Sequence, residues 1–299
     1  MILAALLLAA ATAPPQTVLT IDPKHRIVEG VASDGRIIWV SSILDRTILA
    51  CRAACRSLAV LPRGLHPFAI AWDQRRQRLW VAAGCPPGVR GIVPCQHGAL
   101  LALDWRGRVR SRLETPSGPF QPGDVTVSAG GLFVSDSQNG AVYRLAKDRL
   151  APLIAPGVGK SGQGMALDAA GKQLIVADYS RGLAAVDLAT GVRTLLPRQD
   201  GKPLRGVDGL VRCGDTFLGI YNGDAPGRLL TIRLRPGGVD YGELIDDLAL
   251  PDPTQIAFDG KRLLVVADAG WATLDKPGFV RTAGTPILAI PLSRDCKAI

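Results

Sequence analysis

The stretch QGMALD at residues 163–168, followed by LIVAD at residues 174–178, decides the fold. Each run holds a few apolar residues closed by an aspartate, and Gly171 falls in the turn between them. Short apolar runs separated by a glycine-containing turn are typical of a β-hairpin. The same two-run unit recurs along the chain, so the fold is built from an internal repeat.

Six copies of this unit are present, and successive copies begin 39 to 55 residues apart. That spacing is the length of one four-stranded propeller blade. A second pair of apolar runs follows each copy, as at residues 141–145 and 150–154, and no segment shows sustained helical periodicity. The sequence therefore predicts an all-β, six-bladed β-propeller of four-stranded antiparallel blades. The copies begin at Glu29, Phe68, Gly123, Gln163, Asp208 and Thr254.

The last repeat is one strand short. After Asp268 only residues 286–292 (PILAIPL) provide a further strand, whereas residues 17–21 (TVLTI) form a spare strand before the first blade. Pairing the spare strand with the last blade would close the ring and leave no exposed sheet edge there. We predict this closure, with residues 14–299 forming a single propeller domain.

The first 13 residues have the character of an export signal. Residues 1–13 are apolar and uncharged, and they end in ATA, an A-x-A cleavage pattern, before Pro14. Only the amino terminus supplies positive charge there, so an uncleaved anchor or a misassigned start is the alternative. The run is shorter than the ~20 apolar residues that span a bilayer. We expect a periplasmic or extracellular monomer with no stable membrane insertion after signal removal.

The cysteines fit an exported protein. Six are present, none in a C-x-x-C pair, which favours disulfides over a zinc site. Proximity along the chain suggests the bonds Cys51–Cys55 and Cys85–Cys95, and leaves Cys213 and Cys296 as a long-range pair or as free thiols.

The positive net charge does not point to nucleic acid. The chain carries a formal charge of +9, but its basic residues are spread through turns and form no block. No platform of interleaved aromatic residues accompanies them. A solvated basic surface explains the charge, and we expect a small-molecule ligand as the partner.

The first residues of the repeats converge on the propeller axis. Glu29 and Asp208 would bring carboxylates there and Gln163 an amide, and Asp124, one residue past the third copy, reaches the same axis. Burying such groups is costly without a cation or a hydrogen-bond network. Oxygen ligands suit a hard cation such as calcium better than zinc. The alternative is a channel filled by water and mutual hydrogen bonds.

Four short motifs resemble the gluconolactonase and regucalcin (senescence marker protein) family of six-bladed propellers. They are VEG at 28–30, GD at 123–124, QGM at 163–165 and VDGL at 207–210. In that family a divalent metal is held by a Glu of the first blade, an Asn of the fourth and an Asp of the fifth. The resemblance places these ligands at Glu29, Gln163 and Asp208. Gln163 is one methylene longer than the family's Asn, and Gly123 replaces an Asn typical of the third blade.

The resemblance implies a lactonase, a carboxylic ester hydrolase that opens a sugar lactone or similar cyclic ester. The metal would polarise the carbonyl, and a carboxylate would take a proton from the attacking water. Asp208 is the first candidate for that base and Asp124 the second. The alternative is a non-catalytic propeller that binds a small ligand or a protein and holds only a structural ion. Candidate substrate contacts are Tyr179, Arg181, Tyr221, Asn222 and Trp271.

Overall fold

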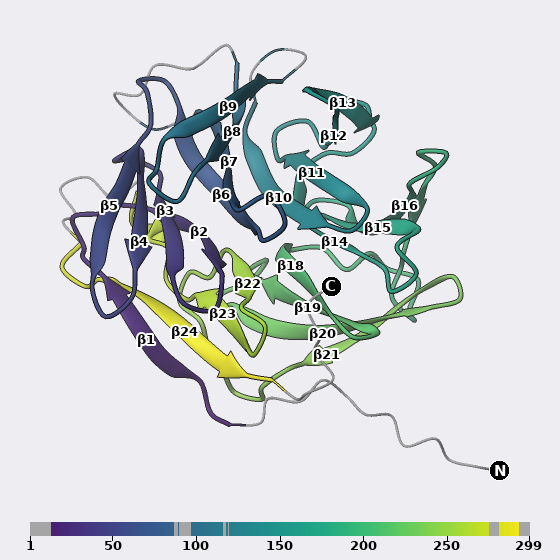
Figure 1. Ribbon diagram of the computed structural model, residues 1–299. Helices are drawn as coiled ribbons and strands as arrows, with labels where there is room; N and C mark the ends of the chain where they lie inside the picture. The colour runs from purple at the N-terminus through teal and green to yellow at the C-terminus, as the bar shows by residue number, and fades with distance from the viewer. Residues whose placement is uncertain are drawn as a thin grey trace.

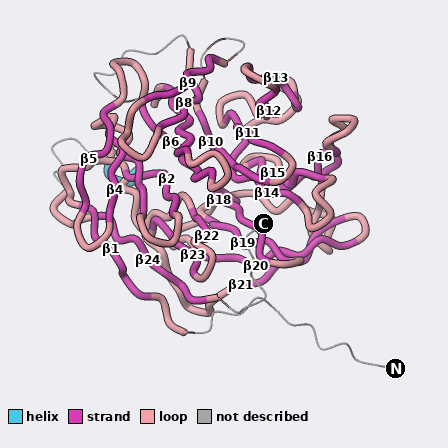
Figure 2. Tube along the Cα trace, in the orientation of Figure 1, coloured by secondary structure: helices cyan, strands magenta, loops and turns pink. Residues whose placement is uncertain are grey.

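Six sheets of four strands each account for most of the described chain, as expected from the repeats. The computed structural model describes residues 13–86, 89, 97–115, 118, 120–274 and 281–292. Residues 1–12 of the predicted export signal lie outside these ranges. Figure 2 shows strands throughout and one short helical turn, η1 (Trp271–Thr273). No helix in the described ranges is long and apolar enough to cross a membrane.

The first three blades follow one another along the chain, each with its strands in sequence order from the axis outward. Blade 1 contains β2 (Val28–Ser33), β3 (Ile38–Ser42), β4 (Thr47–Cys51) and β5 (Cys55–Val60); blade 2 contains β6 (His66–Asp73), β7 (Arg78–Gly84), β8 (Ala99–Leu103) and β9 (Val109–Glu114); blade 3 contains β10 (Pro122–Ser128), β11 (Gly131–Asp136), β12 (Val142–Ala146) and β13 (Arg149–Ile154).

Blades 4 and 5 repeat this order, and blade 6 combines the two ends of the described chain. Blade 4 contains β14 (Gly162–Leu167), β15 (Gln173–Asp178), β16 (Gly182–Asp187) and β17 (Arg193–Leu195); blade 5 contains β18 (Val207–Cys213), β19 (Thr216–Tyr221), β20 (Arg228–Arg235) and β21 (Gly238–Glu243); blade 6 contains β22 (Ile256–Phe258), β23 (Arg262–Val266), β24 (Thr285–Pro291) and β1 (Gln16–Ile21).

The ring closes as the sequence predicts. Strand β1 pairs antiparallel with β24, with Thr20 opposite Pro286, and forms the outer strand of blade 6. Figure 1 shows the first strand beside the last one, and each inner strand contacts the inner strands of the neighbouring blades. The pairing covers an edge of β24 that would otherwise be open to other chains.

A bulge near the start of the inner strands positions the axial side chains. In β2 the pairing register shifts between Val28 and Val31. Glu29 and Gly30 therefore lie together opposite one residue of β3, an arrangement that bends the strand and turns a side chain out of the ladder. The same shift in β18 brings Asp208 to the equivalent point.

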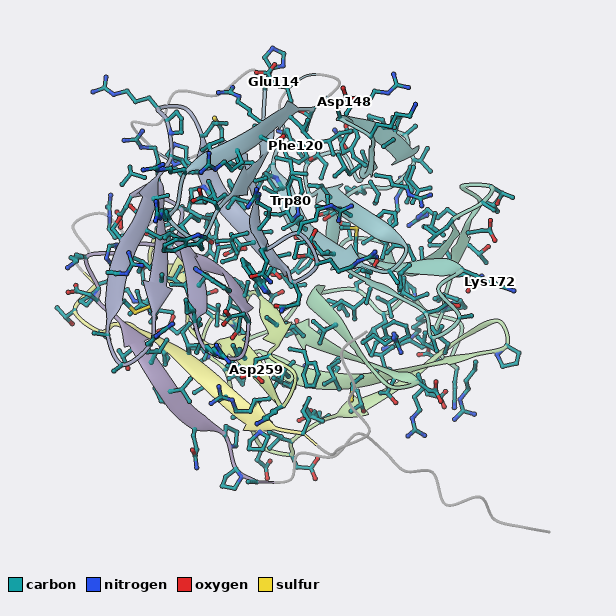
Figure 3. The ribbon with its side chains drawn as sticks, viewed as in Figure 1. Trp80, Glu114, Phe120, Asp148, Lys172 and Asp259 are labelled. Carbon is teal, nitrogen blue, oxygen red and sulfur yellow. A yellow bond between two sulfur atoms is a disulfide. The ribbon has the colours of Figure 1, made fainter. Side chains whose placement is uncertain are left out.

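The hydrophobic core lies between blades. Figure 3 places Trp80 and Phe120 inside the ring and Asp148 and Lys172 toward its periphery. Trp80 of blade 2 belongs to the same buried cluster as Phe120 and Tyr143 of blade 3. The rings of Phe120 and Tyr143 meet edge to face at 6.1 Å. Alternating apolar residues of each strand thus join neighbouring blades as well as strands within one blade.

The disulfides follow the predicted framework where it is described. Cys51 and Cys55 are bonded across the hairpin between β4 and β5. Cys85 and Cys213 are also disulfide-bonded, and the described residues contain no free cysteine. Cys213 is therefore not a free thiol, which was one of the two alternatives for it. The predicted partners Cys95 and Cys296 lie outside the described ranges.

The closing strand should contribute strongly to stability. Ile21 is buried against blade 1 and the rest of blade 6, whereas its neighbour Thr20 is exposed. Ile21→Ala should lower the free energy of unfolding by about 2–5 kcal/mol through lost burial and a cavity. Thr20→Ala should change it by less than about 0.5 kcal/mol. Denaturant unfolding of both variants checks this, and similar values for the two would contradict the closure.

Candidate functional site

Two acidic side chains are buried at the channel mouth where the inner strands begin. Glu29 of β2 is 9% exposed and Asp208 of β18 is 7% exposed. Burial raises the pKa of Glu29 well above its usual range, and the negative charge of Asp208 raises it further. Burial likewise raises the pKa of Asp208 to about 7. The effect of the Asp208 charge on Glu29 means that the two carboxyls lie near each other, as the sequence prediction of a shared axis requires.

Loops at the mouth supply a side-chain donor to each acid. Trp271 donates its indole N–H to Glu29 Oε2 at 2.5 Å. Asn222 Nδ2 donates to Asp208 Oδ2 and to the Pro253 carbonyl, both at 2.8 Å. Among the described residues, Asp208 Oδ1 and Asn222 Oδ1 are buried and have no hydrogen-bond partner. Asp208 and its neighbour Asn222 thus each have a buried oxygen without a hydrogen-bond partner. Such unpaired buried acceptors are rare in folded proteins.

This donor set suits a hard cation. The unpaired oxygens of Asp208 and Asn222 and the carboxylate of Glu29 are the ligand types that calcium prefers. A cation would also offset the repulsion between the two acids. The described residues contain no group of three or more His, Cys, Asp and Glu side chains placed to hold a metal. Binding would therefore depend on the two carboxylates together with amide oxygens.

The turn that carries Trp271 is fixed by Asp252, a residue that sequence reasoning missed. Asp252 Oδ2 accepts from the backbone N–H of Gly270 at 2.9 Å and of Ala272 at 3.1 Å. Its charge also raises the pKa of Glu29 and Asp208, after the larger effect of burial. The sequence signal for Asp252 was weak, because it precedes the last repeat outside the repeated motif.

An apolar wall stands beside Glu29. Trp271 packs against a buried cluster formed by Ile27, Ile43 and Phe68. Phe68, the first residue of the second repeat, is thus buried in this cluster, whereas the first and fifth repeats begin with acids. The mouth therefore combines an acidic side and an apolar side.

Gln163, the predicted ligand of blade 4, packs against Gly123 of blade 3. A Cβ at position 123 would lie 2.7 Å from Gln163 Oε1 and 2.0 Å from the Gly162 carbonyl oxygen. The absence of a side chain at Gly123 therefore leaves room for the longer side chain of Gln163. Gln163 and Gly123, the two departures from the family motifs, therefore fit one another. Their contact places the Gln163 amide at the junction of blades 3 and 4.

Tyr179, a predicted substrate contact, lies next to the acidic pair. Its hydroxyl donates to the backbone carbonyl of Asn222 at 3.1 Å. Burial raises the pKa of Tyr179, and the charge of Asp208 adds to the effect. The structure thus brings Tyr179, Asn222 and Trp271 together around Glu29 and Asp208.

The other two predicted contacts have partners of their own on the surrounding loops. Tyr221 is half-buried and donates its hydroxyl to Asp224 Oδ2 at 2.8 Å. Arg181 is exposed and donates from Nη1 to the Val158 carbonyl at 2.8 Å. Either side chain would have to exchange a hydrogen bond to bind a substrate.

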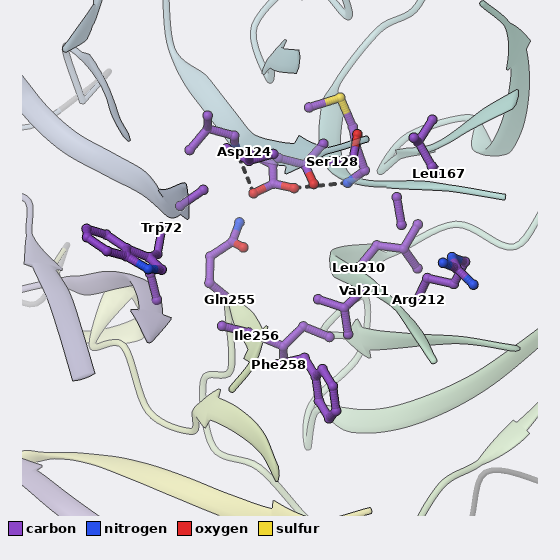
Figure 4. A pocket seen from close by; sticks show the side chains of 18 of the residues that line it. Trp72, Asp124, Ser128, Leu167, Leu210, Val211, Arg212, Gln255, Ile256 and Phe258 are labelled. Carbon is purple, nitrogen blue, oxygen red and sulfur yellow. Dashed lines mark hydrogen bonds between the residues drawn. The ribbon is translucent and has the colours of Figure 1, made fainter. Parts of the chain in front are cut away.

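Asp124 is near the axis but lines a different cavity, at the mouth where the inner strands end (Figure 4). Its carboxylate accepts from the backbone N–H of Val125 at 2.8 Å and of Met165 at 3.0 Å. Gln255 of blade 6 donates to the Gly123 carbonyl of blade 3 at 2.9 Å. Blades 3 and 6 are opposite each other in the ring, so the Gln255 side chain crosses the channel.

No protein-family model and no curated protein sequence matches this chain. Solved structures do match, and they include regucalcin and gluconolactonase six-bladed propellers. A calcium-binding regucalcin from Agrobacterium tumefaciens is 17% identical, with a TM-score of 0.64 over 94% of this chain and 97% of that one.

Two further structures cover nearly the whole chain. A gluconolactonase from Xanthomonas campestris is 17% identical, with a TM-score of 0.61 over 96% of this chain and 97% of that one. The PQQ-bound aldose sugar dehydrogenase from Streptomyces coelicolor is 14% identical, with a TM-score of 0.67 over 96% of this chain and all of that one. At these identities the likeness establishes the fold.

Stability should depend on pH through Asp124. Burial raises the pKa of this carboxyl from 3.8 to about 7 in the folded protein, so the folded state holds its proton more tightly than the unfolded state. Protonated Asp124 therefore adds to the free energy of unfolding at low pH, and this contribution is lost as pH rises toward 7.

The comparison with Asp124→Asn removes this titration together with the smaller effect of the Asp124 charge on the pKa of Asp208. Between pH 4 and pH 8 in chelator, the wild type should lose on the order of 3 kcal/mol more unfolding free energy than the variant. Denaturant unfolding across that range is the measurement. Parallel pH profiles would show that Asp124 titrates normally.

Proposed function

We propose that the protein is a cation-dependent hydrolase that opens a sugar lactone or a similar cyclic ester at the mouth formed by Glu29 and Asp208. The proposal rests chiefly on the buried, unpaired Asp208 Oδ1 beside the unpaired Asn222 Oδ1. The similarity to a gluconolactonase and to a calcium-binding regucalcin supports it.

Calcium fits the donor set best, and a bound divalent cation would polarise the ester carbonyl. Glu29, Asp208 and the Asn222 amide oxygen would hold it. Trp271 keeps the Glu29 carboxylate in place through its indole N–H. Gln163, the predicted third ligand, lies on β14 beside the strand of Asp208, with its amide oxygen facing Gly123.

Asp208 is the proposed general base. Asn222 donates to Oδ2, and Oδ1 has two lone pairs, so one can face the cation while the other accepts a proton from water. The water oxygen bonds to the ester carbon, the ring C–O bond breaks, and the proton passes to the departing ring oxygen to give a hydroxy acid. Asp124, the second candidate, lines the opposite cavity, so we assign the base to Asp208.

Export to the periplasm or the cell exterior is part of the proposal. The Cys51–Cys55 bond, together with bonded Cys85 and Cys213, supports an oxidising compartment. The uncharged segment at residues 1–13 supplies the signal.

The second candidate function is a non-catalytic propeller that binds a small ligand and a structural ion. The departures from the family motifs at Gln163 and Gly123 favour it, because Gln163 stands where the family has a ligand Asn and Gly123 lacks a polar side chain. Both candidates require the cation, and only the first requires turnover.

Calcium should stabilise the folded protein through Asp208. At about 100 times its Kd, an ion that binds only the folded state adds about 2.7 kcal/mol. The melting temperature should therefore rise with calcium concentration in the wild type and in Asp148→Asn, an exposed control. Asp208→Asn should lose the rise. If the melting temperature of the wild type does not change with calcium concentration, the proposed cation site is wrong.

Lactone turnover should depend on the same residue. A pH-stat assay on a panel of sugar lactones should show calcium-dependent acid release, and Asp208→Asn should lower kcat/KM by about 10²-fold or more. Asp148→Asn should retain wild-type rates. Equal rates in wild type and Asp208→Asn would place any hydrolysis elsewhere, and calcium stabilisation without turnover would favour the binding function.

A further inference from the structure

A second cavity opens at the channel mouth where the inner strands end. Its volume is about 380 Å³, and all six inner strands contribute to its lining (Figure 4). A cavity of this size accommodates a small organic molecule. Gln255, whose side chain crosses the ring to the Gly123 carbonyl, lines this cavity, whereas Glu29 and Asp208 do not.

Two acidic residues line the cavity, Asp124 and Asp168, and Asp168 Oδ1 accepts from the backbone N–H groups of Lys172 and Gln173. Asp124 is 8% exposed and Gln255 is 4% exposed, and both line the cavity. The two backbone N–H groups of Val125 and Met165 satisfy hydrogen bonds of Asp124 but bring no net positive charge. Among the described residues, no basic side chain forms an ion pair with Asp124. An uncompensated buried carboxylate is costly, so a cationic group there would be favourable.

The walls are largely apolar and partly aromatic. Trp72 and Phe258 are half-buried and line the cavity together with Val211. Trp72 is held in place, because its ring stacks on Trp39 at 4.7 Å and its N–H donates to Gln74 Oε1 at 2.7 Å. Aromatic faces attract organic cations as well as apolar groups.

We propose that this cavity binds a small organic amine, with its ammonium group at Asp124 and its apolar or aromatic body against Trp72 and Phe258. Anionic ligands are disfavoured because the carboxylate would repel them. The one cationic side chain among the described lining residues, Arg212, donates from Nη1 to the Gly214 carbonyl at 2.6 Å. The site is independent of the hydrolase proposal, since it uses neither Glu29 nor Asp208.

Calorimetric titration with phenethylamine tests the site, with 2-phenylethanol as the uncharged match. The wild type should bind the amine saturably and bind the alcohol at least 10-fold more weakly. Asp124→Asn should weaken amine binding at least 10-fold, because the charge is lost while an acceptor for the backbone N–H groups remains. Asp208→Asn should bind the amine as the wild type does.

Val211→Trp provides a second variant that keeps Asp124 and fills the cavity. Val211→Trp should abolish amine binding. If Asp124→Asn does not fold, this variant still tests whether the amine binds in the cavity. The proposal is overturned by no saturable binding to the wild type, by equal affinity for amine and alcohol, or by undiminished binding in Val211→Trp. It is also overturned if Asp208→Asn loses the amine, or if calcium displaces the amine from Asp208→Asn, which would make Asp124 part of a metal site.

Discussion

The close approach of neighbouring inner strands around the axis is the constraint on which the channel depends. A Cβ on Gly30 would lie 2.6 Å from the Phe68 carbonyl oxygen, and one on Gly164 would lie 2.3 Å from the Asp208 carbonyl oxygen. Side chains are thus excluded at these points, while the preceding residue at each bulge, such as Glu29, projects into the channel. The same packing that closes the ring therefore decides which residues can reach the axis.

Acidic groups gather on the axis of a chain whose net charge is +9. Glu29 and Asp208 belong to one mouth and Asp124 to the other, with Gln255 across the channel. Burial raises the pKa of all three, so the folded protein tolerates these acids at a cost in stability. Buried groups that cost stability are retained most often where a ligand uses them. The channel thus carries buried acids at both of its mouths.

The architecture could be predicted from the sequence, because the repeat spacing and the spare strand at residues 17–21 reflect local patterns. The convergence of Glu29 and Asp208 followed from aligning the repeats. The hydrogen bond of Asn222 to Asp208 and the contact of Gln163 with Gly123 could not be predicted, because they depend on loop paths and on packing between blades. Gln255 left one detectable signal, a long polar side chain where three repeats carry glycine.

Terbium luminescence tests the cation site most directly, because terbium replaces calcium and is excited by a nearby tryptophan. Trp271, one of five tryptophans, contacts Glu29. Excitation of tryptophan should give terbium emission that saturates and that calcium displaces. Trp271→Phe should lose the emission but keep stabilisation by calcium, and Asp208→Asn should lose both. Absence of emission from the wild type, or full emission from Trp271→Phe, would contradict a cation held by Glu29 and Asp208.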